Sequence, residues 1–203
     1  MIGFAFLVSP AAAAGRWGCY GTKPGHPTPE ERAAFIVEVS VLAVHAEKTH
    51  GVPASALAAI AIAESGYGWT RVALNANNLF AWKFVPGSTP ALKAYVPACE
   101  RRRANRYAAF DSKAHAFDFV AAKLATLDAY RGHTEAYRAA LKQGVAGEAA
   151  VKAWLAGVAT SYSHKPAEFT RKIIRIMNDP AQPADLVSPD TNLYRLSVVA
   201  RRP

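Results

Sequence analysis

The chain has 203 residues, 51% of them hydrophobic, which is enough for one sizeable core but short for two independent domains. Its formal net charge of +9 suits a polyanionic partner such as nucleic acid, an anionic membrane surface or the bacterial wall, and charge does not choose among them. Beyond the N-terminal stretch, no segment approaches the roughly 20 apolar residues needed to cross a bilayer, so we expect no stable membrane insertion.

Residues 1–14 run from an apolar segment through Ser9-Pro10 into four alanines. This order is typical of the end of a secretory signal peptide, although the positively charged start is missing. A buried N-terminal segment is the alternative. We therefore expect a signal peptide over residues 1–14 and a secreted or periplasmic bacterial protein.

Residues 15–27 are rich in glycine, proline and aromatic residues and predict an irregular N-terminal arm. The chain has two cysteines, Cys19 in this arm and Cys99 directly before Glu100. In an exported protein they could form a disulfide, and two reduced thiols are the alternative. No cluster of histidine and cysteine has the spacing of a zinc site, so we expect no metal.

Two helices are predicted after the arm. Thr28, Pro29 and Glu31 form the pattern of a capping box with proline at the first helical position. Gly51 ends this helix, and a second helix is expected from Pro53 to about Ser65, before Gly66. The apolar residues that share one face of the first helix are Phe35, Val39, Leu42 and Ala46.

Residues 77–110 lack helical periodicity and contain short aromatic and β-branched runs broken by prolines, which predicts a loop-rich lobe with a small hairpin. Helical periodicity resumes after Ser112 and continues to about Met177. Residues 180–203 show little periodicity and are expected to form an extended, poorly anchored tail. The predicted fold class is mainly α, with one helical domain over residues 28–179.

Glu64 is the most informative single residue. Leu57, Ile60 and Glu64 fall at helical spacing, which places a carboxylate on an apolar stripe. A carboxylate there is either paired or has a raised pKa, and a raised pKa suits the general acid of a glycosidase. The alternative is an ordinary solvated glutamate in the last helical turn.

The surrounding motifs resemble a known family. Residues 59–69 read AIAIAESGYGW and residues 77–83 read NNLFAWK. They resemble the "A-x-x-x-E-S-G-W-G" and "N-N-L-F-G-I-K" motifs of the glucosaminidase family of peptidoglycan hydrolases, glycoside hydrolase family 73. Residues 107–112 resemble its "F-R-x-Y-x-S" segment. Residues 160–176 more loosely resemble its "Y-A-T-D-x-x-Y-x-x-K-I" end.

This resemblance implies a lysozyme-like helical domain with a β-hairpin lobe, in which Glu64 is the essential acid and Tyr162 the active-site tyrosine. Two departures from the family motifs, Ala81-Trp82 and the Ser163-His164-Lys165 run, affect the expected substrate preference. Trp82 is also a candidate sugar-stacking platform, although a single aromatic residue is more often part of the core. The residues expected to bind substrate at the cleft and its floor are Asn78, Phe80, Trp82 and Lys83.

A second carboxylate is harder to assign. Glu100 is the candidate, because the family carries a mobile acidic residue on a hairpin, and we expect its lobe to close over bound glycan. A solvated, salt-bridged loop is the alternative interpretation of Glu100. Asp111 is the competitor, although a turn or near-cap role fits it better.

The predicted function is an endo-β-N-acetylglucosaminidase that hydrolyses the bond from N-acetylglucosamine to N-acetylmuramic acid in peptidoglycan. We expect a monomer that needs no cofactor. A lytic transglycosylase is an alternative, but the chain lacks a Gly-Leu-Met-Gln segment after Glu64. A non-catalytic cell-wall-binding module is another. A nucleic-acid binder is supported only by net charge, and we expect no nucleic acid as partner.

Overall fold

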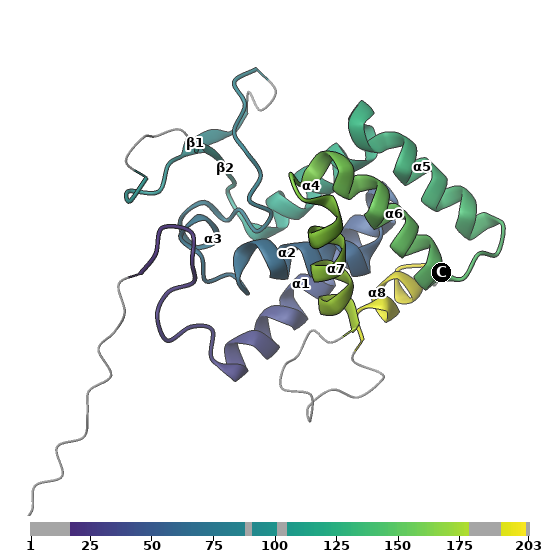
Figure 1. Ribbon diagram of the computed structural model, residues 1–203, viewed down its shortest axis with the longest axis horizontal. Helices are drawn as coiled ribbons and strands as arrows, with labels where there is room; N and C mark the ends of the chain where they lie inside the picture. The colour runs from purple at the N-terminus through teal and green to yellow at the C-terminus, as the bar shows by residue number, and fades with distance from the viewer. Residues whose placement is uncertain (1–16, 88–90, 101–104, 179–191, 202–203) are drawn as a thin grey trace, which may run out of the picture.

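The computed structural model describes residues 17–87, 91–100, 105–178 and 192–201. These residues form a group of packed helices with a small lobe at one side, where the two strands lie (Figure 1). The predicted signal peptide lies outside the described residues. Within the described part of the chain, no helix is both long and apolar enough to cross a membrane.

The first helix, α1 (Pro29–His50), begins as its sequence predicts. The Thr28 hydroxyl accepts a hydrogen bond from the Glu31 N–H at 3.2 Å, and the Glu31 carboxylate accepts one from the Thr28 N–H at 2.8 Å. The helix ends at Gly51, whose φ of 67° is in the left-handed region. The predicted capping box and the predicted end are both confirmed.

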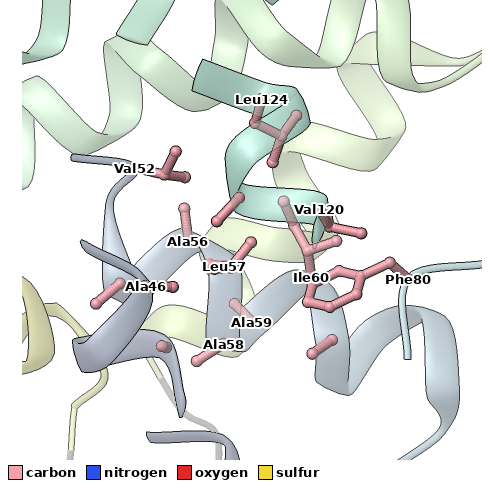
Figure 2. Close-up of a cluster of buried hydrophobic side chains, with 14 of the residues drawn as sticks. Ala46, Val52, Ala56, Leu57, Ala58, Ala59, Ile60, Phe80, Val120 and Leu124 are labelled. Carbon is pink, nitrogen blue, oxygen red and sulfur yellow. The ribbon is translucent and has the colours of Figure 1, made fainter. Parts of the chain in front are cut away.

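The second helix, α2 (Ala54–Ser65), is the centre of the domain. Every residue from Ala54 to Ile62 is buried. Its many alanines leave room for neighbouring helices to approach from several sides, and α1 and α7 (Pro166–Asn178) pack closely on it. Figure 2 shows side chains of α2 meeting Val52, Phe80, Val120 and Leu124 from other parts of the chain.

The remaining helices complete the domain. Those that follow Ser112 confirm the predicted return of helical structure there. Since each buries one apolar face, they close a single core around α2. Their bounds are α3 (Arg71–Ala76), α4 (Lys113–Thr126), α5 (Asp128–Lys142) and α6 (Gly147–Tyr162).

The loop-rich lobe carries the predicted hairpin. Strand β1 (Lys93–Tyr95) pairs antiparallel with β2 (Tyr107–Ala109), and Ala94 lies opposite Ala108. Lys83 forms an isolated bridge with Tyr107, so the segment after α3 joins the same lobe. The expected fold class, mainly α with a small hairpin lobe, is confirmed.

The expectation of an extended C-terminal tail is wrong for its described part. A short helix, α8 (Tyr194–Val199), packs on α1, α2 and α6. Leu193, Leu196 and Ala200 are buried there, and the Ser197 and Ser55 hydroxyls lie 3.0 Å apart. The spacing of these apolar residues is helical but covers only two turns, which is too short to predict a helix without its packing partners.

Candidate active site

Glu64 lies in the last turn of α2 and reaches the surface because the helix ends directly after it. Gly66 adopts a left-handed φ of 57°, and a Cβ there would lie 2.3 Å from the Thr22 side chain. The buried Ser65 hydroxyl donates to the Ala61 carbonyl at 2.6 Å and accepts from the Gly68 N–H at 2.8 Å. The Glu-Ser-Gly sequence thus terminates a buried helix with its carboxylate at the edge of the core.

The Glu64 side chain is 25% exposed and opens into a cleft of about 630 Å³. The cleft runs between the end of α6, the segment after α3, and the hairpin lobe. Among the described residues that line it, Glu64 is the one carboxylate. The other lining residues are Phe80, Ala81, Trp82, Lys83, Val85, Tyr107, Tyr130, Ser161, Tyr162, Ser163, His164 and Lys165.

Burial raises the pKa of the Glu64 carboxyl above its ordinary value, and the nearby Lys172 ammonium partly opposes this shift. The Lys172 Nζ lies 4.0 Å from Glu64 Oε1 and donates to the Ala63 carbonyl at 3.0 Å. A carboxyl with a raised pKa keeps its proton to higher pH, as a general acid must. Both expected features are present, since Glu64 has a cation partner and its burial raises the pKa. The catalytic role of Glu64 stays a prediction.

We predict that Lys172→Met raises the pKa of Glu64 further, because the substitution removes a cation that stabilises the carboxylate. Activity that needs protonated Glu64 falls as pH rises through this pKa, so the basic limb of the kcat/KM profile should move to higher pH. The folding stability depends on pH in the same direction. Because the pKa of Glu64 is higher in the folded state than in the unfolded state, Glu64 contributes most to the free energy of unfolding at low pH, and this contribution falls as pH rises.

The measurement is kcat/KM against pH for the wild type and for Lys172→Met. Arg175→Met is the control, because Arg175 is an exposed cation one turn further along α7 and the substitution changes net charge equally. A basic limb that moves the same way in both variants would assign the effect to net charge rather than to the Lys172 contact.

Tyr162 ends α6 at the cleft. Its hydroxyl donates to the Phe80 carbonyl at 2.7 Å, and its ring centroid lies 6.2 Å from that of Trp82. Burial raises the pKa of Tyr162 well above its ordinary value, and the charge of Glu64 adds to the shift. Tyr162 is therefore a protonated phenol near Glu64 that also holds the Phe80 segment in place.

The structure places Asn78 beneath the cleft rather than in it. The residue is 1% exposed. Its amide donates to the Trp82 and Ala108 carbonyls at 2.9 and 2.8 Å, and its Oδ1 accepts from the Phe80 and Trp82 N–H groups at 3.2 and 3.0 Å. Asn78 was expected at the cleft and its floor, and its hydrogen-bonding capacity is used to shape that floor. A role of Asn78 in binding substrate stays a prediction.

We predict that Asn78→Ala lowers the free energy of unfolding by about 2–4 kcal/mol, because it leaves backbone groups beneath the cleft without partners. Urea unfolding followed by circular dichroism measures the loss. Asn75→Ala is the control: Asn75 is exposed on α3, and its loss should cost under about 1 kcal/mol. Equal losses in the two variants would remove the floor-shaping role from Asn78.

The other predicted binding residues divide between floor and wall. The Phe80 ring is buried against Phe117, with centroids 4.9 Å apart, so Phe80 contributes its backbone to the cleft. Trp82 and Lys83 line the cleft with their side chains partly or well exposed. Ala81 has a φ of 50°, a left-handed conformation that accounts for the glycine of the related motif at this place.

Glu100 and Asp111 have different surroundings. Glu100 Oε2 accepts hydrogen bonds from the Tyr20 hydroxyl and from the Asn105 amide, the latter at 3.2 Å. Burial is the largest cause of the raised pKa of Tyr107, and the negative charges of Glu100 and of Glu64 add to it. This cleft residue therefore lies near both carboxylates. The Asp111 side chain is 97% exposed and pairs with His115 at 3.3 Å. Neither Glu100 nor Asp111 lines the cleft itself.

Lys172 and Tyr130 are site residues that sequence reasoning missed. Lys172 is the lysine of the segment that resembles "Y-x-x-K-I", so the motif contained a signal for it. Tyr130 carried no such signal, because only packing brings α5 to the cleft. Among the described residues, no group of three or more histidine, cysteine or acidic side chains is arranged to hold a metal ion.

Comparisons with known proteins agree with this geometry. The sequence profile of the glucosaminidase family, described as mannosyl-glycoprotein endo-beta-N-acetylglucosaminidase, matches residues 40–182. The catalytic domain of the autolysin Auto from Listeria monocytogenes superposes with a TM-score of 0.50 at 19% identity, covering 84% of this chain and 90% of that one. No curated protein matches. Because the family profile spans more than half of the sequence, the chain belongs to the glucosaminidase family and is a glycoside hydrolase.

Proposed function

We propose that the enzyme is an endo-β-N-acetylglucosaminidase that hydrolyses the bond from N-acetylglucosamine to N-acetylmuramic acid in peptidoglycan. The observation that carries the proposal is Glu64, a carboxyl with a raised pKa, in the cleft of a glucosaminidase-family fold. The similar Listeria domain is named an autolysin, which fits a wall substrate.

In the proposed reaction, Glu64 donates its proton to the oxygen of the leaving sugar while positive charge develops on the N-acetylglucosaminyl ring. Glu100 is the proposed second carboxylate, which would activate water or stabilise that charge. The Tyr162 hydroxyl would meet the substrate's acetamido group in this reaction. Trp82 offers an aromatic wall to a pyranose ring.

Basic side chains around the cleft support an anionic glycan as the substrate. Lys83, His164 and Lys165 line it, and Lys172 lies beside Glu64. Muramic acid carries a lactyl carboxyl group or a peptide that ends in carboxylates, whereas chitin is neutral. Cations at the wall therefore favour peptidoglycan over neutral polymers of N-acetylglucosamine.

We further propose that the enzyme acts as a monomer in a secreted or periplasmic location. Peptidoglycan lies outside the cytoplasmic membrane, and disulfides such as Cys19–Cys99 persist in oxidising compartments.

Product analysis tests the proposed function. Purified peptidoglycan is digested, reduced with borohydride and examined by mass spectrometry. Hydrolysis at the proposed bond leaves N-acetylglucosamine as the new reducing end. Anhydro-muramic ends would identify a lytic transglycosylase, reducing muramic acid ends a muramidase, and binding without cleavage a non-catalytic wall module.

We predict that Tyr162→Phe lowers kcat about tenfold. The substitution removes a hydroxyl near Glu64 and releases the Phe80 carbonyl, while the ring can still pack on Phe169. Steady-state release of reducing ends gives kcat, and thermal melting reports stability. Full activity would make Tyr162 a packing residue, as a core tyrosine on the same helix face would be.

A further inference from the structure

We propose that the N-terminal arm, residues 17–27, is a positioning device of the active site. In this proposal the Cys19–Cys99 disulfide and the hydrogen bond from Tyr20 to Glu100, together called the tether, hold the Glu100 carboxylate beside Tyr107. Turnover depends on this tether. The inference rests on the proposed function and on the proposed role of Glu100.

At the lobe, the arm is joined to Glu100 in two ways. Cys19 and Cys99 form a disulfide, and the residues that follow them, Tyr20 and Glu100, are hydrogen-bonded through the Tyr20 hydroxyl and Glu100 Oε2. Asn105 donates to Glu100 Oε2 at 3.2 Å and to the Tyr20 hydroxyl at 3.0 Å. Two donors thus fix the position of one carboxylate oxygen next to a covalent link.

The other part of the arm is anchored to the turn that follows α2, beside α3 (Figure 1). The Lys23 N–H donates to the Trp69 carbonyl at 2.9 Å, and the His26 ring stacks on Trp69 with centroids 3.9 Å apart. The Arg71 guanidinium lies 3.7 Å from the centre of the Trp17 ring. The arm therefore connects the turn after Glu64 with the lobe that carries Glu100.

The tether also reaches the cleft wall. Lys83, which lines the cleft, donates to Asn105 Oδ1 at 3.0 Å. The Tyr20 ring lies beside Tyr107, another lining residue, with centroids 6.5 Å apart. We expect the lobe that carries Glu100 to close over bound glycan, and these contacts restrict how far Glu100 can move from the cleft wall while the disulfide is intact.

The arm lies before the segment that the family profile matches, which begins at residue 40. The tether is thus not implied by membership of the family. A dithiol reductant would break it by transferring two electrons and two protons to the disulfide, leaving two thiols on the protein while the reductant closes to its own cyclic disulfide. The contacts of the arm with Trp69 and Arg71 would remain.

The test compares kcat and KM on peptidoglycan glycan for three variants. The double variant Cys19→Ser/Cys99→Ser should lose about tenfold or more in kcat with little change in KM, because a misplaced catalytic group slows chemistry rather than binding. Tyr20→Phe keeps the disulfide and should lose less. Tyr95→Phe is the matched control, since its hydroxyl contacts Asn75 rather than Glu100.

Dithiothreitol should lower the kcat of the wild type to that of the double serine variant and leave the double variant unchanged. The decisive readout repeats the comparison in a Glu100→Gln background. If the tether acts by placing Glu100, then breaking the disulfide should not lower kcat further in the Glu100→Gln background. The reason is that the broken disulfide and the Glu100→Gln substitution remove the same function.

Equal losses in the wild-type and Glu100→Gln backgrounds, or no loss in either, would overturn the positioning role and leave the arm a structural element. Thermal melting of each variant shows whether the fold itself is affected. If the oxidised wild type releases no reducing ends from peptidoglycan, the proposed function fails first, and this inference fails with it.

Discussion

Glu64→Gln is expected to lower kcat by at least about a thousandfold while leaving the melting temperature nearly unchanged. Glutamine keeps the shape of the side chain at the end of α2 but has no proton to give to the leaving sugar oxygen. Since the pKa of Glu64 is already raised by burial, replacing the carboxyl with a neutral amide does not add a burial cost. The measurement is clearance of purified peptidoglycan together with thermal melting.

Glu135→Gln is the control for this experiment. Glu135 is an exposed glutamate on α5, outside the cleft, and its substitution by glutamine changes the net charge by the same amount as Glu64→Gln. We expect its activity to match the wild type. If Glu64→Gln still cleared peptidoglycan at a near wild-type rate, the assignment of Glu64 as the general acid would be wrong.

The second large effect is expected for Glu100→Gln, with a loss of about a hundredfold or more in kcat. Asp111→Asn should retain nearly normal activity, because the Asp111 side chain is 97% exposed and pairs with His115 rather than with a residue of the cleft. The negative charges of Glu64 and Glu100 both contribute to the raised pKa of Tyr107, so both carboxylates lie near this cleft residue. Glycan release measured at saturating substrate separates the two variants.

Each alternative result of this comparison has a defined meaning. A severe loss only in Asp111→Asn would transfer the role of second carboxylate to Asp111. Near-normal rates in both variants would favour a reaction in which the substrate's own acetamido group stabilises the positive charge, without a second protein carboxylate. In that case the tethered Glu100 would have a structural role in the lobe.

Much of the helical framework could be predicted from local patterns. The capping box at Thr28, the glycine ends of α1 and α2, and the apolar faces beyond Ser112 depend on residues a few positions apart. Glu64 was found in the same way, because helical spacing and the adjacent Ser-Gly sequence are both local. Local interactions act within one element and can therefore be recognised before its neighbours are known.

The details of the cleft depended on contacts between distant parts of the chain. The Asn78 side chain binds the Ala108 backbone, 30 residues away, and this contact, which shapes the floor of the cleft, has no local sequence pattern. Helix α8 forms where its few apolar residues find a surface on α1 and α2.

The disulfide and the surroundings of Glu100 were likewise decided by tertiary structure. The sequence left open whether Cys19 and Cys99 pair, and it contained no pattern that joins Tyr20 to Glu100. Cys19 and Cys99 are 80 residues apart in the sequence, and so are Tyr20 and Glu100. Such contacts form because α2 and its neighbours close one core and hold the arm and the lobe against it, a result of the packing of the whole chain rather than of any one segment.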